Sequence, residues 1–140
     1  MNIVEKALSI ALEAHTGQVD KADQPYILHP IRLMLHMETE NEMAAALLHD
    51  VIEDTSMTYD HLLKNGMPQS VIDILKHITK IDGESYDTFI DRVSKNDSAR
   101  KIKIEDIKDN MNVNRLMKLT EEDLERLKKY HSALKKLNGS

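Results

Sequence analysis

The sequence predicts an all-α fold, with one compact helical domain over residues 1–140. Apolar residues recur at helical spacing along most of the chain, and no segment shows the polar and apolar alternation of a strand. Aromatic residues make up only 4% of the sequence, so the core is expected to consist of aliphatic side chains and Met, a mixture that favours packed helices. The length suits one core and is too short for two comfortable domains.

The spacing of apolar residues and the positions of two prolines predict the first two helices and the loop between them. Residues 3–15 carry apolar side chains at helical intervals and form the first expected helix. The segment 17–28, GQVDKADQPYIL, is expected to be an ordered loop, because Pro25 has no backbone N–H to donate to a helix. A second helix is expected over 30–38, with His29 held extended by the proline ring that follows it.

The later helices are delimited by start and stop signals. Gly66 ends one helix and Pro68 begins the next, and Thr120 with Asp123 forms a capping box for the last helix. The expected ranges are about 41–54, 58–65, 68–78, 86–95, 98–113 and 120–137. The basic stretch LKKYHSALKKL in the last helix is expected to be a solvated face, with phosphate binding by its lysines as the alternative.

Composition excludes several classes of function. The formal net charge is -5 and no Lys/Arg-rich tract is present, which argues against a duplex nucleic-acid partner. The chain has no Cys, which excludes disulfides, thiolate metal sites and a Cys nucleophile. No signal peptide or membrane-spanning apolar run is seen, so a cytoplasmic protein without a membrane partner is expected. The sequence leaves open whether the chain forms a homodimer.

Residues 45–55, AALLHDVIEDT, gather ionisable side chains on two turns of an expected helix. His49, Asp50 and Glu53 share the arc opposite the apolar face, and Asp54 lies at its border. Between Arg32 and Lys64 there are seven acidic residues and no Lys or Arg. Packed carboxylates repel one another, and a divalent cation is the usual remedy. The alternative is that this arc is only the wetted face of an amphipathic helix.

The helix expected over 98–113 is apolar on two arcs, which places Asp106 away from solvent. A buried carboxylate needs a counter-charge. One interpretation is a metal ion, and the alternative is a salt bridge to a Lys or Arg. With His29, His49 and Asp50, Asp106 would supply two imidazole nitrogens and two carboxylate oxygens from three segments. Such a set suits Mn, Fe or Zn and is typical of a catalytic site with positions open for water.

Three strings, AHTGQVDKADQPYILHP, AALLHDVIEDT and IKIEDIKDN, occur in order over residues 14–110 and resemble the HD-domain hydrolases of the RelA/SpoT alarmone family. The resemblance implies a helical HD domain with one divalent ion, commonly Mn²⁺, that removes pyrophosphate from the 3′ position of guanosine tetra- or pentaphosphate. By position it implies His29, His49, Asp50 and Asp106 as metal ligands, Glu53 and Asp54 as the acidic pair that handles the attacking water, and Lys21, Asn110 and Tyr26 as phosphate or nucleotide contacts.

The sequence departs from the family pattern at three positions. Asp20 stands where these hydrolases usually have Arg, and Ile107 and Asp109 stand in place of Arg and His. A carboxylate about 4 Å from a phosphate oxygen could cost up to a few kcal/mol even at an effective dielectric near 20. The expected substrate class is therefore a phosphorylated nucleotide whose identity stays open. The alternatives are a metal-bound nucleotide sensor with little turnover, an HD phosphohydrolase for a different nucleotide, and a helical interaction module with no ligand.

Overall fold

The computed structural model describes residues 1–139, and within that range the regular elements are helices, with one isolated bridge between Val19 and Pro25. In order they are α1 (Ile3–His15), α2 (Leu28–Met34), α3 (Glu40–Leu48), α4 (Val51–Asp54), α5 (Tyr59–Lys64), α6 (Gln69–Ile78), α7 (Tyr86–Val93), α8 (Asp97–Asn110), the 3₁₀ turn η1 (Val113–Arg115) and α9 (Glu121–Leu137). The all-α prediction is confirmed.

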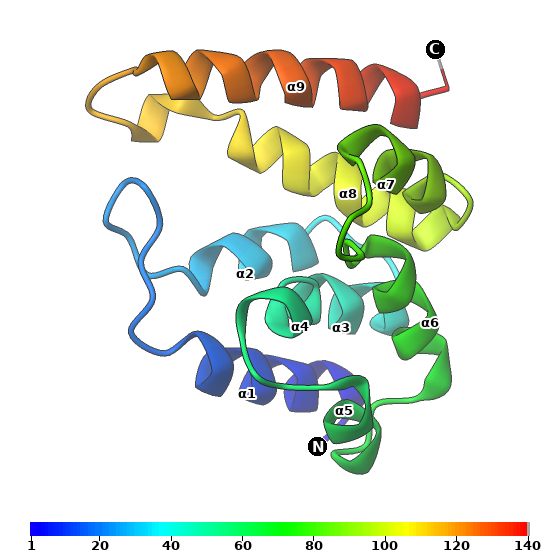
Figure 1. The fold of residues 1–140 in the computed structure, drawn as a ribbon. Coiled ribbons are helices and arrows are strands. Elements are labelled where there is room, and N and C mark those ends of the chain that lie inside the picture. The colour runs from blue at the N-terminus through cyan, green and yellow to red at the C-terminus, as the bar shows by residue number, and fades with distance from the viewer. Residues whose placement is uncertain (140) are drawn as a thin grey trace.

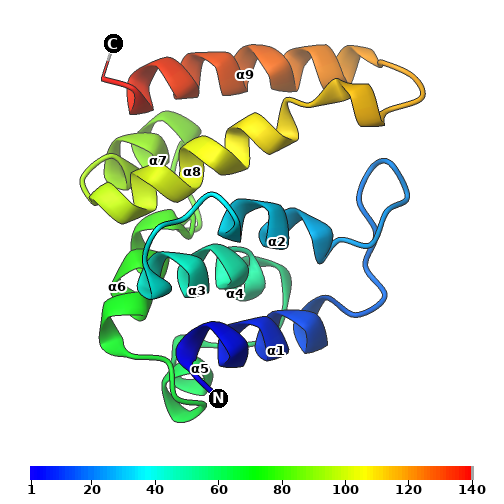
Figure 2. The ribbon, with the colours of Figure 1, turned by 180° about the vertical axis from the view of Figure 1, so that it is seen from behind.

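The helices stack in layers, with α1 at one end, α2 to α4 in the middle, and α8 and α9 at the other end (Figure 1). Seen from behind, the same order holds, and α5 to α7 run along one side of the stack (Figure 2). The central helix α3 packs against α1, α2, α6 and α8. The α1–α2 loop and the η1–α9 link both lie on the side opposite α6 (Figures 1 and 2).

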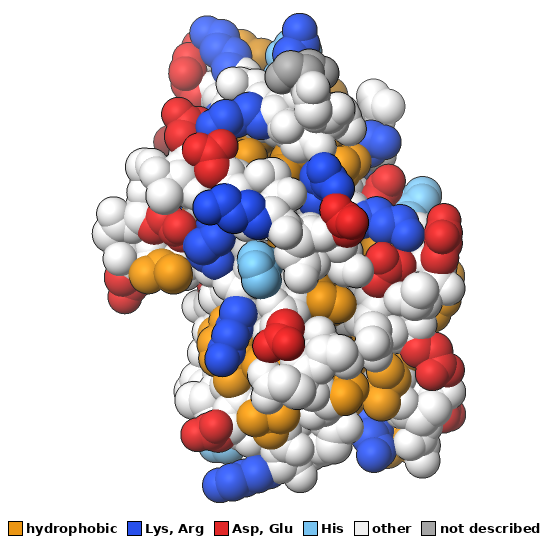
Figure 3. All heavy atoms as spheres, turned by 90° about the vertical axis from the view of Figure 1, so that its right-hand side faces the viewer, with side chains coloured by type: hydrophobic (Ala, Val, Ile, Leu, Met, Phe, Trp, Pro, Cys, Tyr) orange, Lys and Arg blue, Asp and Glu red, His pale blue; other side chains and the backbone are white. Residues whose placement is uncertain are grey.

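The core is aliphatic, as the composition predicts. Residues 44–48 of α3 are completely buried, and Leu33, Leu62, Ile72, Leu75 and Ile90 are also fully enclosed. On the face shown in Figure 3, acidic and basic side chains are intermingled, and hydrophobic atoms form small separate patches between them. Within the part of the chain that is described, no helix is both long and apolar enough to cross a bilayer.

Several capping signals are confirmed. The bounds of α1 agree with the prediction, and Asn2 and Glu5 form a capping box at its start that the spacing of apolar residues does not reveal. Thr120 and Asp123 form the predicted box at the start of α9. Pro68 is the residue before α6, and Gly66 ends the preceding helix with φ 94°, a conformation that glycine adopts without a steric penalty.

Three predicted boundaries were wrong, each for a local reason. Helix α2 ends at Met34 because the chain tightens into i→i−3 turns that place Met37 in the core. It also begins before Pro30, so His29 is helical and not extended; a proline in the first turn withholds no needed donor. Helix α8 ends at Asn110 because the side chain of Arg115 folds back to the Asp109 carbonyl oxygen at 2.9 Å.

The expected helix over 41–54 is interrupted at His49 and Asp50, which separate α3 from α4. Asp50 has φ -104° and ψ -2°, outside the usual helical values, and its carboxylate contacts Tyr26 and His49. The interruption therefore coincides with the pair of residues that were expected to carry chemistry. His49 and Ala46 are buried, so the alternative of a merely wetted helix face was wrong for this part of the arc.

Candidate functional site

His49 ends α3 with its imidazole inside the protein, where 5% of the residue is exposed. Its Nδ1 atom lies 2.7 Å from the carbonyl oxygen of Ala46 and donates to it, so Nε2 is the ring nitrogen that faces the interior. Nε2 lies 3.0 Å from Asp50 Oδ2 and 3.5 Å from Asp106 Oδ1. Burial lowers the pKa of His49, but Asp50 and Asp106 outweigh that effect and raise it well above its usual value.

His29 lies in the first turn of α2 and faces two carboxylates of α8. Its Nε2 atom is 2.9 Å from Asp106 Oδ1, and its Nδ1 atom is 2.6 Å from Asp109 Oδ2. Arg32, one turn further along α2, holds the Asp109 carboxylate with Nε and Nη2 at 2.8 and 2.9 Å. A carboxylate behind an imidazole fixes the ring and its tautomer, as in many histidine metal sites.

Asp106 is 5% exposed and has partners for both carboxylate oxygens. Oδ1 faces the two imidazoles and accepts from Asn110 Nδ2 at 3.2 Å, and Oδ2 lies 2.8 Å from Lys103 Nζ. Burial raises the pKa of Asp106, but Lys103 and the two histidines outweigh it and hold this pKa well below its usual range. The salt-bridge alternative is thus partly realised by Lys103, although Oδ1 stays directed at the imidazoles.

The donor set fits a divalent metal ion. One ligand atom from each of His29, His49 and Asp50 lies within 4.8 Å of the other two, and Asp106 Oδ1 adjoins both imidazoles. His49 Nε2 is buried, and its short contact with Asp50 Oδ2 does not have the geometry of a hydrogen bond, which leaves the atom free to bind another ligand. Two imidazoles with carboxylates and no thiolate suit Mn, Fe or Zn. All four residues predicted as ligands come together here.

The acidic pair Glu53 and Asp54 lies on α4, one turn after His49 and Asp50. Glu53 accepts the backbone N–H of Lys80 at 2.6 Å and lines a cavity with His49, Asp50 and Asp106. Asp54 does not line that cavity, but shares a neighbouring hollow with Glu53. Partial burial raises the pKa of both carboxyl groups, and Asp50 adds to the effect in each case. Both groups are therefore more basic than ordinary surface carboxylates.

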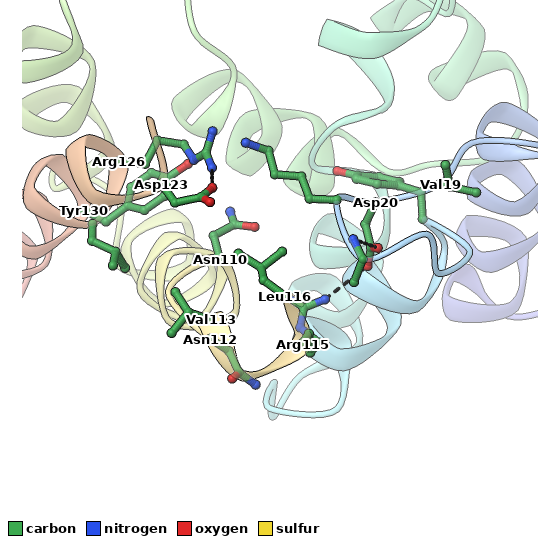
Figure 4. A pocket seen from close by; sticks show the side chains of 14 residues that line it. Val19, Asp20, Asn110, Asn112, Val113, Arg115, Leu116, Asp123, Arg126 and Tyr130 are labelled. Atoms are coloured by element: carbon green, nitrogen blue, oxygen red, sulfur yellow. Dashed lines mark hydrogen bonds and ion pairs between the residues drawn. The ribbon is translucent and has the colours of Figure 1, made fainter. Parts of the chain in front are cut away.

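A larger cavity, of about 410 Å³, opens between the α1–α2 loop, the end of α8 and α9 (Figure 4). The three residues expected to contact substrate, Lys21, Tyr26 and Asn110, all line it. The Tyr26 hydroxyl also donates to Asp50 Oδ2, and its ring contacts His15 and His29. Tyr26 and Asn110 therefore connect this cavity to the candidate metal ligands.

Two of the departures from the family pattern are charges that the protein itself neutralises. Arg115 lies 3.1 Å from Asp20 Oδ2 and 3.8 Å from Asp109 Oδ2, and the first contact is visible in Figure 4. The hydrogen bonds from His29 and Arg32 lower the pKa of Asp109 despite its partial burial. Ile107 is fully buried in the core. Neither Asp20 nor Asp109 is thus an uncompensated carboxylate facing the cavity.

Sequence reasoning missed several residues of the site. Lys103 could have been noticed from its i, i+3 spacing to Asp106. Arg115, Arg126 and Tyr130 line the larger cavity from segments whose position relative to the loop no local pattern indicates. Asp109 was interpreted only as a departure, because its partners His29 and Arg32 are about eighty residues away along the chain.

The sequence was compared with protein families and with known proteins. Residues 7–113 match the HD domain family. The guanosine-3′,5′-bis(diphosphate) 3′-pyrophosphohydrolase of Haemophilus influenzae is 42% identical over 84 residues, and the bifunctional (p)ppGpp synthase/hydrolase SpoT of Escherichia coli is 36% identical over 83; each match covers 56% of this chain. The matched segment spans only 12% of either relative's length.

The fold likeness extends further along the chain. A solved structure of a metazoan ortholog of SpoT, described as hydrolysing ppGpp, superposes with a TM-score of 0.80. The superposition covers 98% of this chain and 85% of that one, at 22% sequence identity. Helix α9, which the family match leaves out, is therefore included in the structural likeness.

Proposed function

The chain belongs to the HD domain family, and on this basis we propose that it is a metal-dependent phosphohydrolase that removes pyrophosphate from the 3′ position of guanosine 3′,5′-bis(diphosphate). The observation that carries the proposal is the convergence of His29, His49, Asp50 and Asp106, with both histidine Nε2 atoms directed at the carboxylates of Asp50 or Asp106. The names of the relatives support the choice of reaction and substrate. Asp20 and Asp109 are paired with arginines, so their carboxylates are not free to repel the phosphates of a highly charged nucleotide.

His29, His49, Asp50 and Asp106 would hold the ion, and Mn²⁺ suits their nitrogen and oxygen donors. When bound, such an ion polarises a phosphoryl oxygen and lowers the pKa of water towards about 7 in the best cases. Asp109, held by Arg32, keeps the His29 ring in the orientation that presents Nε2. The Lys103 ammonium group donates to Asp106 Oδ2 and offsets the negative charge of this carboxylate.

Glu53 acts as the general base, because its raised pKa and its place in the cavity wall suit proton abstraction from water. The water oxygen bonds to the phosphorus next to the sugar, and the bond from that phosphorus to the 3′ oxygen breaks. The 3′ oxygen gains a proton, and the products are a nucleoside 5′-diphosphate and pyrophosphate. Asp54, which shares a neighbouring hollow with Glu53 and does not line this cavity, takes the proton onward from Glu53.

The nucleotide occupies the 410 Å³ cavity. Lys21 offsets phosphate charge there, and Asn110, one turn after Asp106 on α8, hydrogen-bonds the sugar or base. The Tyr26 ring forms part of the wall beside Asp50. These roles leave the 5′-phosphates near Lys21 and the 3′-phosphates near the candidate metal ligands.

A product-resolved assay tests the proposal. The full chain with Mn²⁺ is incubated with guanosine 3′,5′-bis(diphosphate), GDP, GTP and ATP, and products are separated by anion exchange. The expected products are GDP and pyrophosphate from the first nucleotide only. Release of single phosphates would overturn the assigned reaction, and turnover confined to another nucleotide would indicate an HD phosphohydrolase with a different substrate. Tight binding without any product would favour the nucleotide sensor, and absence of bound metal would favour an interaction module.

A further inference from the structure

A second cavity, of about 230 Å³, is lined by three of the four candidate metal ligands, His49, Asp50 and Asp106. One wall is acidic and consists of His49, Asp50, Glu53 and Asp106. The facing wall is basic and aromatic, and consists of Lys80, Lys103, Lys129, Tyr86 and Phe89. Lys129 comes from α9, which lies outside the residues 7–113 that match the family. The basic wall therefore depends in part on a helix that the family match does not cover.

The basic wall carries more positive charge than its neighbours neutralise. Lys103 is paired with Asp106, but within residues 1–139 neither Lys80 nor Lys129 forms an ion pair. Lys129 Nζ lies 4.6 Å from the centroid of the Tyr86 ring and 5.3 Å from that of Tyr130. Burial and the nearby cations, Lys103 first among them, lower the pKa of Lys129. These contacts hold the ammonium group in place without supplying an anionic partner.

The hydroxyl group of Tyr86 points to a ligand independently of the charges. It is buried and has no hydrogen-bond partner among residues 1–139. Buried hydroxyl groups are nearly always hydrogen-bonded, so an unpartnered one in a cavity that is also lined by two unpaired lysines is an available donor. A phosphate oxygen is the acceptor that both the hydroxyl and the ammonium groups would bind.

We propose that Lys129, Lys80 and the Tyr86 hydroxyl form a binding site for the terminal phosphate of the pyrophosphate that the reaction releases. This inference rests on the proposed function and adds a specific role for α9. The phosphate next to the sugar is held at the acidic wall, where the metal ligands lie, and a second phosphate extends across the cavity to the basic wall. A substrate with a single phosphate at the cleaved position would leave the basic wall unused.

Binding of pyrophosphate and inorganic phosphate tests this site without turnover. The full chain is loaded with Mn²⁺, freed of excess ion, and titrated with each anion by isothermal calorimetry. The wild-type protein is expected to bind pyrophosphate at least tenfold more tightly than phosphate. Lys129→Met, which keeps the aliphatic stem, and Tyr86→Phe, which keeps the ring, are each expected to weaken pyrophosphate binding about tenfold and to leave phosphate binding unchanged.

Lys128→Met is the matched control, because Lys128 is the exposed neighbour on α9, pairs with Glu125 and does not line the cavity. It is expected to bind both anions as the wild type does. Wild-type pyrophosphate binding in Lys129→Met and Tyr86→Phe would overturn the site. An equal loss of both anions in these variants would also overturn it, because it would indicate general electrostatic attraction.

The two proposals fail in different ways. If no nucleotide yields product, the hydrolase proposal fails, while the calorimetric comparison still decides whether Lys129 and Tyr86 select pyrophosphate. If pyrophosphate is released from the nucleotide but Lys129→Met binds it like the wild type, only the subsite is overturned.

Discussion

At the scale of single residues, both candidate imidazole ligands are oriented through Nδ1. The Ala46 carbonyl oxygen binds Nδ1 of His49, and the Asp109 carboxylate binds Nδ1 of His29. Both Nε2 atoms then face Asp106 Oδ1. The orientation of the site thus depends on a backbone carbonyl and on one carboxylate that itself needs Arg32.

Asp109→Asn is expected to weaken Mn²⁺ binding by roughly 10- to 100-fold, because an amide orients and charges the His29 ring less effectively than a carboxylate does. Competition with a chromophoric chelator measures the affinity. Asp97→Asn is the control, since Asp97 is exposed on the same helix and pairs with Arg100 on the surface. Unchanged metal affinity in Asp109→Asn would show that Asp109 does not position His29.

Glu53→Gln and Asp106→Asn are expected to separate chemistry from metal binding. Glu53→Gln should retain the metal and lower kcat by about 10²- to 10⁴-fold, because the general base is lost. Asp106→Asn should lower both metal content and turnover. Elemental analysis beside product assays measures the two effects. A full complement of metal in Asp106→Asn would count against Asp106 as a ligand.

Residues of the site could be predicted where the signal came from neighbouring positions in the sequence. His49, Asp50 and Glu53 share two turns, and the burial of Asp106 followed from the apolar arcs around it. The pairing of Asp109 with Arg32 was not predictable, because the two residues are far apart in the chain and many charge pairings satisfy the same composition.

At the scale of elements, capping signals and apolar spacing predicted α1, α5, α6 and α9 well because those signals act within one or two turns. The interruption between α3 and α4 was missed. The helix propensities of His and Asp differ little from those of other polar residues, and the contacts of Asp50 with Tyr26 and His49 arise only in the folded protein. Tertiary contacts thus outweighed propensity at that point.

The link between α6 and α7 depends on Arg92. Its guanidinium group donates to the Glu84 carboxylate at 2.9 Å through both Nε and Nη2, and to the carbonyl oxygens of Lys76 and Thr79 at 2.5 and 2.7 Å. One side chain thus closes the end of α6 and fixes the loop that leads to Tyr86. The hydrogen bonds from Arg92 lower the pKa of Glu84 to about 2.

A pH dependence of stability follows from this pair. The pKa of Glu84 is lower in the folded than in the unfolded chain. The Glu84–Arg92 pair therefore contributes fully to the free energy of unfolding above the unfolded pKa, about 4.3, and this contribution is lost as the pH falls towards about 2. Urea unfolding of the wild type and Glu84→Gln at a series of pH values measures it. The difference in unfolding free energy should shrink as the pH drops through this window, and Glu13→Gln, on the exposed face of α1, is the control for a Glu→Gln change outside this pair. A constant difference would refute the assignment.

At the scale of the whole molecule, the predicted fold class is confirmed, while the joining of distant segments into one site required the structure. The lysines of the basic stretch of α9 are exposed, as predicted for a solvated face, and in addition Lys129 and Tyr130 line the two cavities. The amphipathic pattern of a helix shows which side is polar, but it does not show what another element places opposite that side.

We expect residues 1–140 to unfold as one domain. Helix α9 packs on α7 and α8, and α8 packs on the central helix α3, so α9 is connected to the common core. Scanning calorimetry should give a single transition whose van't Hoff and calorimetric enthalpies agree. A separate transition that disappears when α9 is removed would show that this helix is an independent unit.

Metal removal is expected to lower the midpoint of thermal unfolding. An ion that binds only the folded protein adds about 2.7 kcal/mol at 100 times its Kd, which for a chain of this size corresponds to roughly 5–10 °C. Unfolding with added Mn²⁺ and with chelator measures the shift. Asp106→Asn should show little or none of it, and an equally large shift in that variant would place the ion elsewhere.

The contacts of Arg115 have a consequence for exchanging residues with relatives. The Arg115 guanidinium group lies beside the carboxylates of Asp20 and Asp109, two of the positions that differ from the RelA/SpoT-type pattern described in the sequence analysis. Restoring arginine at position 20 alone would bring two like charges together and leave Asp109 with one fewer neighbour. Positions 20, 109 and 115 therefore form an epistatic set, and a chimera should transplant them jointly.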